Sequence, residues 1–161
     1  MKKTKEIISD KVAAVNQILP HTNKWAWDLF IDGAANNWMP TEISMAKDIE
    51  QWRGDSLTED EKLVIKRSLG FFAGSESLVA NNLLLSVFKF VTDPECRQYI
   101  LRQAYEESLH NLTVVYCCDS LGLDIEEVYE AYNSVPSIKA KDVFLMNICT
   151  DINRVDFNIN T

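Results

Sequence analysis

The sequence has only two histidines, His21 and His110, among its 161 residues. Any metal site in this chain must therefore rely on carboxylates, and carboxylate-rich sites suit iron and manganese better than structural zinc. The cysteines fit no zinc-binding spacing, and we interpret them as reduced core thiols of a cytosolic protein. These cysteines are Cys96, Cys117, Cys118 and Cys149.

Long apolar runs are also absent, and the 16 basic residues are outnumbered by 24 acidic ones. No run of about 20 apolar residues could span a membrane, and the start, Met1–Glu6, lacks the apolar core of a signal peptide. The formal net charge of -8 and the pI near 4.7 argue against a nucleic-acid surface, which needs clustered Lys and Arg. These absences predict a cytoplasmic protein that contacts neither membranes nor nucleic acids.

Residues 1–161 have the length of one domain. With 47% apolar residues, a chain of this length can build a real core. The sequence shows neither the alternation of a strand nor a short repeat. We therefore predict an all-α fold around two long core helices, at about 58–91 and 93–121.

Local signals mark the ends of these two helices. Thr58 with Glu61 forms a capping box, and Asp93 stands as an N-cap before a proline. Gly122 ends the second helix, whereas Gly70 and Gly74 could loosen or bulge the first. Further helices are predicted at 1–19, from 23 to an end at or just before Trp38, and at 41–52, 124–132 and 137–152.

Glu107 and His110 form a Glu-x-x-His pair within the second long helix. Residues three apart share one helical face, so a carboxylate oxygen and an imidazole nitrogen can converge on one metal ion. The helix is apolar on most sides, and a carboxylate there is costly unless it is paired or metal-bound. The alternative is a partly exposed Glu and a core His, because this spacing is common. For Glu76 two interpretations are equally favoured: a metal ligand, or a solvated side chain near a helix break.

Several stretches together resemble the small, radical-generating subunit of class I ribonucleotide reductase. The resemblance covers nearly the whole chain from about residue 20 and is closest to the branch whose first metal ligand is Glu rather than Asp. The matching stretches are Trp38–Ile43, Gly70–Val79, Asn81–Asn82, Arg102–His110 and Ile138–Asp142.

The resemblance implies a ferritin-like bundle in which four helices hold a dinuclear metal centre. Glu76, Glu107 and His110 match ligands on the first two metal-bearing helices, so this bundle would be incomplete. Trp38 matches the tryptophan on the electron-transfer route, which also passes the metal-bound His110. The implied function is that of a ribonucleoside-diphosphate reductase small subunit. Its metal centre generates the oxidant with which the partner large subunit makes deoxyribonucleotides.

Two departures from the family pattern qualify this prediction. The family's radical tyrosine lies one turn after the ligand histidine, where this chain has Val114, and Tyr116 faces another side of the helix. The resemblance then implies an oxidising equivalent stored on the metals, with manganese, iron or both in the centre. No histidine follows His110, so a second Glu-x-x-His is lacking.

We therefore expect the N-terminal part of a small subunit, inactive without its C-terminal half and the large subunit. The alternative is a self-associating, ferritin-like half-bundle without reductase activity, in which two copies each supply Glu76 and the Glu107–His110 pair. Apolar faces around 83–87 and 112–115 would lie uncovered. We expect these faces to lead to a homodimer or to a complex with the missing half.

Overall fold

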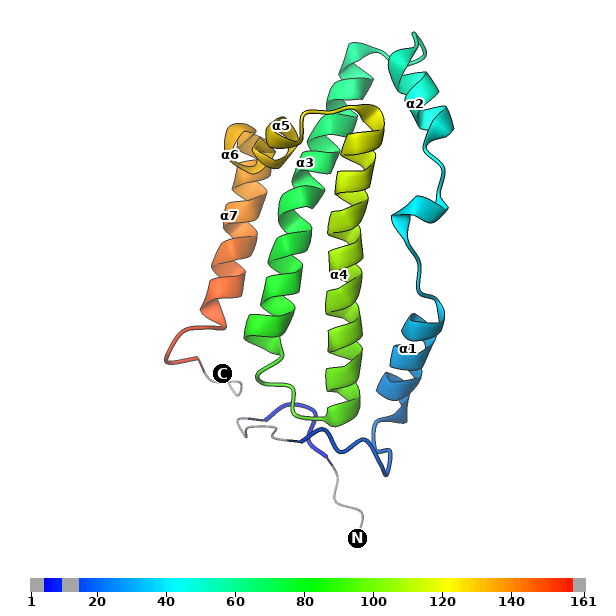
Figure 1. Ribbon diagram of the computed structural model, residues 1–161. Coiled ribbons are helices and arrows are strands. Elements are labelled where there is room, and N and C mark those ends of the chain that lie inside the picture. Colours follow the sequence, from blue (N-terminus) through cyan, green and yellow to red (C-terminus); the bar gives the residue numbers. More distant parts are fainter. Residues whose placement is uncertain (1–4, 10–14, 158–161) are drawn as a thin grey trace. The chain divides into compact units, whose positions relative to one another are not determined.

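The computed structural model describes residues 5–9 and 15–157, and over these residues the chain is helical (Figure 1). The described part has no strand beyond an isolated bridge between Ile8 and Val91. The predicted all-α class is confirmed. The elements are the helices α1 (Lys24–Ala35), α2 (Ala46–Arg53), α3 (Glu59–Asn81), α4 (Pro94–Leu121), α5 (Ile125–Tyr129), α6 (Ala131–Ser134) and α7 (Pro136–Asp151), the 3-10 turn η1 (Pro40–Glu42) and the π-helix η2 (Asn82–Val87).

The residues group into two compact units. The first unit comprises Met1–Asn37, Val79–Glu106 and Asn147–Thr161. The second unit comprises Trp38–Leu78 and Glu107–Met146. All four candidate site residues therefore belong to the second unit.

The core of the second unit joins α3, α4 and α5 through small side chains. Ala73, Val114, Cys118 and Val128 form its buried apolar cluster. A Cβ on Gly70 would lie only 2.5 Å from the Cβ of Ala131, so a glycine is needed for this close approach. The expectation that a glycine loosens this helix is wrong, because α3 stays α-helical through Gly70 and Gly74. The irregular segment follows later, as the π-helix η2.

Predicted capping signals hold at three helix ends. The Thr58 amide donates to Glu61 Oε2 at 2.8 Å, and the Glu61 amide donates to Thr58 Oγ1 at 3.3 Å, which completes the capping box. The Cys96 amide donates to Asp93 Oδ1 at 2.9 Å at the start of α4. Gly122, with φ +67°, follows the last residue of α4.

The predicted helix over 1–19 is wrong where the structure describes this stretch. Residues 5–9 and 15–19 are not helical, while 1–4 and 10–14 lie outside the described residues. The Ser9 amide donates to the Phe90 carbonyl at 3.0 Å, and the Thr92 amide donates to the Ile7 carbonyl at 2.9 Å. This pairing with a segment about eighty residues away replaces the local hydrogen bonds of a helix.

One further expectation needs correction. The helix predicted over 41–52 is divided into η1 and the later α2, because the backbone at Ile43 is extended. On α1, Ala26 is buried, whereas its neighbour Trp25 is 56% exposed.

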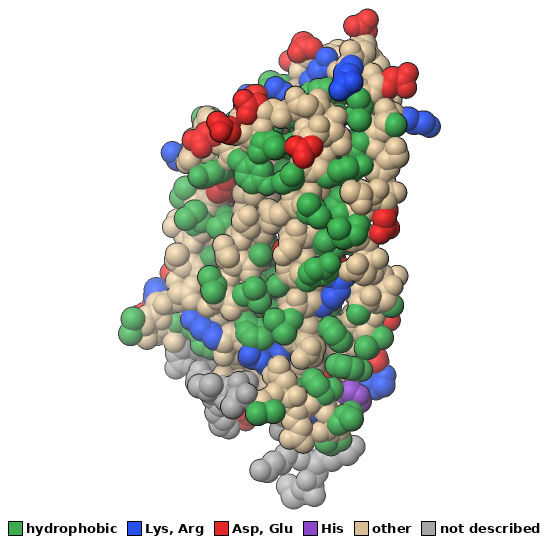
Figure 2. Space-filling view, viewed as in Figure 1, with side chains coloured by type: hydrophobic (Ala, Val, Ile, Leu, Met, Phe, Trp, Pro, Cys, Tyr) green, Lys and Arg blue, Asp and Glu red, His purple; other side chains and the backbone are tan. Residues whose placement is uncertain are grey.

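The surface retains many apolar side chains. Leu85 is 70% exposed and Leu112 is 42% exposed, as predicted, whereas Val114 is buried at 4%. Figure 2 shows apolar side chains across the visible face and acidic side chains gathered over α5 and α6. None of the helices in the described ranges is both long and apolar enough to cross a membrane.

Candidate metal centre

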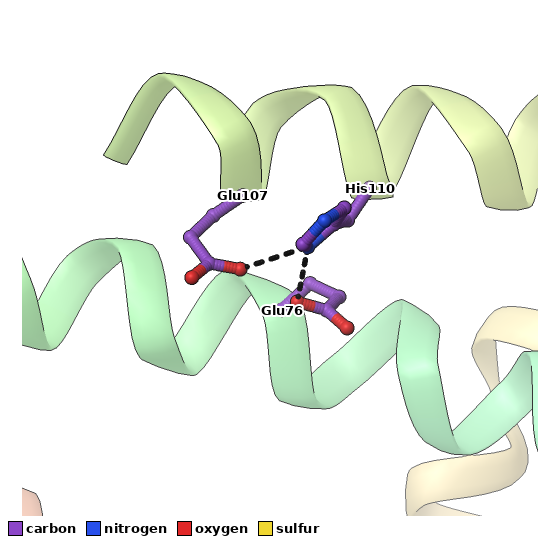
Figure 3. A group of neighbouring side chains, drawn as sticks. All are labelled: Glu76, Glu107 and His110. Carbon is purple, nitrogen blue, oxygen red and sulfur yellow. Dashed lines mark hydrogen bonds and ion pairs between the residues drawn. The ribbon is translucent and has the colours of Figure 1, made fainter. Parts of the chain in front are cut away.

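Three side chains of the second unit converge on one point. His110 Nδ1 lies 3.1 Å from Glu76 Oε2 and 3.1 Å from Glu107 Oε2. Glu76 reaches this point from α3, and the other two side chains reach it from α4 (Figure 3). Each residue offers one ligand atom, and these atoms lie within 4.8 Å of one another. No other such group of three His, Cys, Asp or Glu side chains occurs in the part of the protein that the structure describes.

The local sequence explains why these donors meet. Glu107 and His110 are three residues apart on α4, so helical geometry alone brings them to the same face. Asn111, the next residue, donates from Nδ2 to the Glu107 carbonyl at 3.1 Å. Ser77, the residue after Glu76, has its Oγ 3.4 Å from Asn111 Oδ1. A polar link between α3 and α4 therefore lies beside the three donors.

Burial differs among the three side chains. Those of Glu107 and Glu76 are 10% and 18% exposed, whereas that of His110 is 43% exposed. Burial and the neighbouring Glu76 carboxylate raise the pKa of Glu107, and His110 opposes this rise only in part. Burial lowers the pKa of His110, but its hydrogen bonds to the two carboxylates outweigh this effect and raise the pKa overall. The cluster thus concentrates negative charge where solvent screens it poorly.

Trp38 lies beyond the end of α1, in the connection that leads to η1. Its ring centroid is 6.1 Å from that of His110, with 32° between the ring planes. Both rings border an open pocket of about 310 Å³. The pocket is lined by Trp38, Leu69, Phe72, Glu76, His110, Thr113 and Val114. The structure thus brings Trp38 and the three predicted ligands to one place, while the role of each residue stays a prediction.

Val114 and Tyr116 have different surroundings on α4. Val114 is buried beside Ala73 in the core cluster and also borders the pocket. Tyr116 donates from its hydroxyl to the backbone carbonyl of Ile43 at 2.8 Å. Nothing in the sequence indicates this hydrogen bond, because the acceptor is a main-chain atom in a loop 73 residues earlier.

The sequence reasoning also missed a buried acid. Asp142 on α7 is only 5% exposed, and neither carboxylate oxygen has a hydrogen-bond partner among the described residues. Gly74 faces it so closely that a Cβ there would lie 3.4 Å from Asp142 Oδ2. Burial raises the pKa of Asp142, and the charge of Lys141 opposes this rise. In the sequence Asp142 stands out only as the last residue of the family-matching stretch Ile138–Asp142, directly after another charged residue, Lys141.

Fold and site together define an all-helical protein with a carboxylate–histidine cluster between two core helices. The sequence profile of the family "Ribonucleotide reductase, small chain" matches residues 15–159. The protein therefore belongs to the ribonucleotide reductase small-chain family.

Individual relatives agree with this assignment. The chain is 50% identical to "Ribonucleoside-diphosphate reductase subunit beta" of Chlamydia pneumoniae over 157 residues, which cover 45% of the relative and 98% of this chain. It is 28% identical to "Ribonucleoside-diphosphate reductase small chain" of Plasmodium falciparum (isolate Dd2) over 130 residues, which cover 37% of the relative and 79% of this chain. The chain thus spans less than half the length of these two relatives.

A solved structure supports the fold. The ribonucleotide reductase R2 subunit from Clostridium botulinum superposes with a TM-score of 0.74 at 23% identity, over 41% of that protein and 82% of this one. Such R2 proteins are ferritin-like helical proteins. The predicted ferritin-like class is confirmed.

Proposed function

We propose that this chain forms part of the small subunit of a ribonucleoside-diphosphate reductase. In this proposal Glu76, Glu107 and His110 are ligands of a dinuclear metal centre. The observation that carries the proposal is the convergence of these donor atoms within 4.8 Å in a small-chain family member. We assign the remaining ligands of the centre to polypeptide outside the described residues.

The donor set fits a hard or borderline metal ion. Two carboxylates and one imidazole are typical of iron and manganese sites, and neither a thiolate nor a second imidazole takes part in the cluster. The raised pKa of Glu107 reflects its burial first and its repulsion by the nearby Glu76 carboxylate second. A bound cation would offset this repulsion. Glu76 and Glu107 would supply its negative ligands, and His110 would supply the neutral one.

When bound, the dimetal centre supplies a one-electron oxidant for a cysteine of the large subunit. Within this chain, we assign to Trp38 the relay of an electron between the large subunit and His110, because the two rings lie side by side at 6.1 Å. Val114 cannot be oxidised to a radical, so this position of the chain cannot store the oxidising equivalent. From the resemblance to the family branch that stores the oxidising equivalent on its metals, we propose a centre that contains manganese in one or both positions, in a cytoplasmic and homodimeric small subunit.

A reductase assay tests this proposal. It uses the small subunit that contains residues 1–161, mixed with the large subunit. Replacing Trp38 with Phe is expected to reduce turnover to background while the metal content stays unchanged. Trp25→Phe is the matched control, because Trp25 is 56% exposed on α1. Wild-type turnover in the Trp38→Phe protein would contradict the assigned relay.

A further inference from the structure

The connection that carries Trp38 has little regular structure of its own. Residues 36–45 separate α1 from α2 and contain only the short turn η1. The Met39 amide donates to Glu42 Oε1 at 3.0 Å, and the Ile43 amide donates to the Pro40 carbonyl at 3.1 Å. These bonds shape the turn, but they join residues of the same segment. They therefore do not determine where the turn lies on the second unit.

Side-chain burial anchors this segment at one residue in particular. Pro40 is buried, whereas Met39 is 38% exposed and Ile43 is 68% exposed. The exposed Ile43 gains little from apolar contact, yet its carbonyl accepts a hydrogen bond from the Tyr116 hydroxyl at 2.8 Å. This bond attaches the end of the segment directly to α4.

α4 therefore contacts both ends of the segment Trp38–Ile43. His110 lies beside Trp38 at one end, and Tyr116 holds Ile43 at the other. Six helical residues rise about 9 Å, a distance that five residues of partly extended chain can span. Figure 1 shows the segment, in cyan, running beside α4.

We propose that Tyr116 is a positioning residue, whose hydroxyl holds the Trp38 segment against α4 and so keeps the indole beside His110. The inference rests on the proposed electron-transfer role of Trp38. In this positioning role the Tyr116 side chain is not itself oxidised. Removal of the hydroxyl should let the segment detach more often, without disturbing the three predicted ligands.

The test compares wild type, Tyr116→Phe and Tyr132→Phe, with each protein labelled with 5-fluorotryptophan. Tyr132 belongs to the same unit and is 44% exposed, so its variant removes a hydroxyl without affecting the segment. In Tyr116→Phe we expect the ¹⁹F resonance of Trp38, assigned with Trp38→Phe, to shift or broaden. The signals of the other three tryptophans should stay unchanged, as should all four signals in Tyr132→Phe.

Hydrogen exchange of a peptide covering residues 36–45 gives the size of the effect. It should accelerate about fivefold in Tyr116→Phe, which corresponds to the loss of one hydrogen bond of about 1 kcal/mol. An unchanged Trp38 resonance and exchange rate in a folded Tyr116→Phe protein would overturn the proposal. Equal effects in both variants, or a general loss of helicity, would also overturn it, because the hydroxyl would then serve the fold as a whole.

Neither readout needs metal or turnover. A protein that lacked reductase activity altogether would still show the ¹⁹F and exchange changes, so the two proposals fail independently. If both hold, Tyr116→Phe lowers the turnover of the assembled reductase while metal affinity stays at the wild-type value.

Discussion

His110 Nδ1 lies 3.1 Å from Oε2 of Glu107, one helical turn earlier on α4. Both side chains come from one helix, so its backbone places them on the same face without any packing between elements. Glu76 joins them from α3, at the same distance from the same nitrogen. A small tertiary rearrangement can therefore change the contribution of Glu76 while the pair on α4 stays intact.

Loss of a residue that only hydrogen-bonds a metal ligand weakens metal binding roughly 10–100-fold. Glu107→Ala removes a ligand itself, so it should weaken Mn²⁺ binding by more than this. The substitution removes a negative ligand and leaves Glu76 and His110 behind. Isothermal titration with Mn²⁺ measures the effect. Asp119→Asn, an exposed change on the same helix, should bind as the wild type does. Equal affinities in all three proteins would show that the metal binds elsewhere.

Glu95 should make the first unit sensitive to acid. Burial alone would raise the pKa of Glu95, but hydrogen bonds from Asn23, Thr22 and His21 lower it from 4.5 to about 2. Because the folded pKa is the lower one, this stabilisation is fully present above about pH 4.5 and is lost as the pH falls toward 2. The shift corresponds to about 3 kcal/mol at neutral pH.

Denaturant unfolding of Glu95→Gln checks this prediction. At pH 7 the variant should be less stable than the wild type by a few kcal/mol, and the difference should shrink as the pH falls below 4.5. Glu126→Gln, an exposed change in the first turn of α5, is the control. A difference between Glu95→Gln and wild type that does not vary with pH would argue against this ionic cluster.

Asp142→Asn should have the opposite effect on stability. Burial raises the pKa of Asp142 above 3.8, so the folded protein carries a charging penalty at neutral pH that disappears below the unfolded pKa. Removing the charge should raise the free energy of unfolding at pH 7 by roughly 1–2 kcal/mol. The gain should vanish near pH 3.

Thermal unfolding at the two pH values measures this gain. Asp55→Asn in the exposed loop before α3 is the control and should change little. Destabilisation by Asp142→Asn at pH 7 would mean that the carboxylate is needed in its charged form.

The valine at position 114 determines which radical signal we expect. In the assembled small subunit, electron paramagnetic resonance should show a metal-centred signal and no tyrosyl doublet, because valine cannot form a radical at the position one turn after His110. Tyr116→Phe should leave this spectrum unchanged, since Tyr116 lies about 200° further round the helix than Val114. A doublet that disappears in Tyr116→Phe would make Tyr116 the radical site.

The sequence predicted those parts of the fold that local interactions determine. The Thr58–Glu61 capping box, the Asp93 cap and the stop at Gly122 depend on residues a few positions apart, and all three are confirmed. The helix predicted over 1–19 is wrong over the described residues because apolar spacing alone suggested it, whereas Ile7–Ser9 pair with the backbone near Val91. Periodicity carries no information about such distant pairing.

In the candidate site, too, local features could be predicted from the sequence and distant contacts could not. The pair Glu107–His110 follows from helical geometry, whereas the choice of Glu76 and Trp38 came from the family resemblance. The Tyr116–Ile43 hydrogen bond, and the lack of a hydrogen-bond partner for Asp142 within residues 5–9 and 15–157, depend on tertiary packing, which a single sequence does not reveal.

The most direct test of the metal centre uses the fact that the protein has only two histidines. Electron spin-echo envelope modulation of Mn²⁺ bound to the protein detects nitrogen from a coordinated imidazole. The proposed centre predicts this ¹⁴N coupling in the wild type and in His21→Ala, and its loss in His110→Ala. Coupling that survives in His110→Ala, or bound Mn²⁺ without any ¹⁴N coupling in the wild type, would contradict a site built on Glu76, Glu107 and His110.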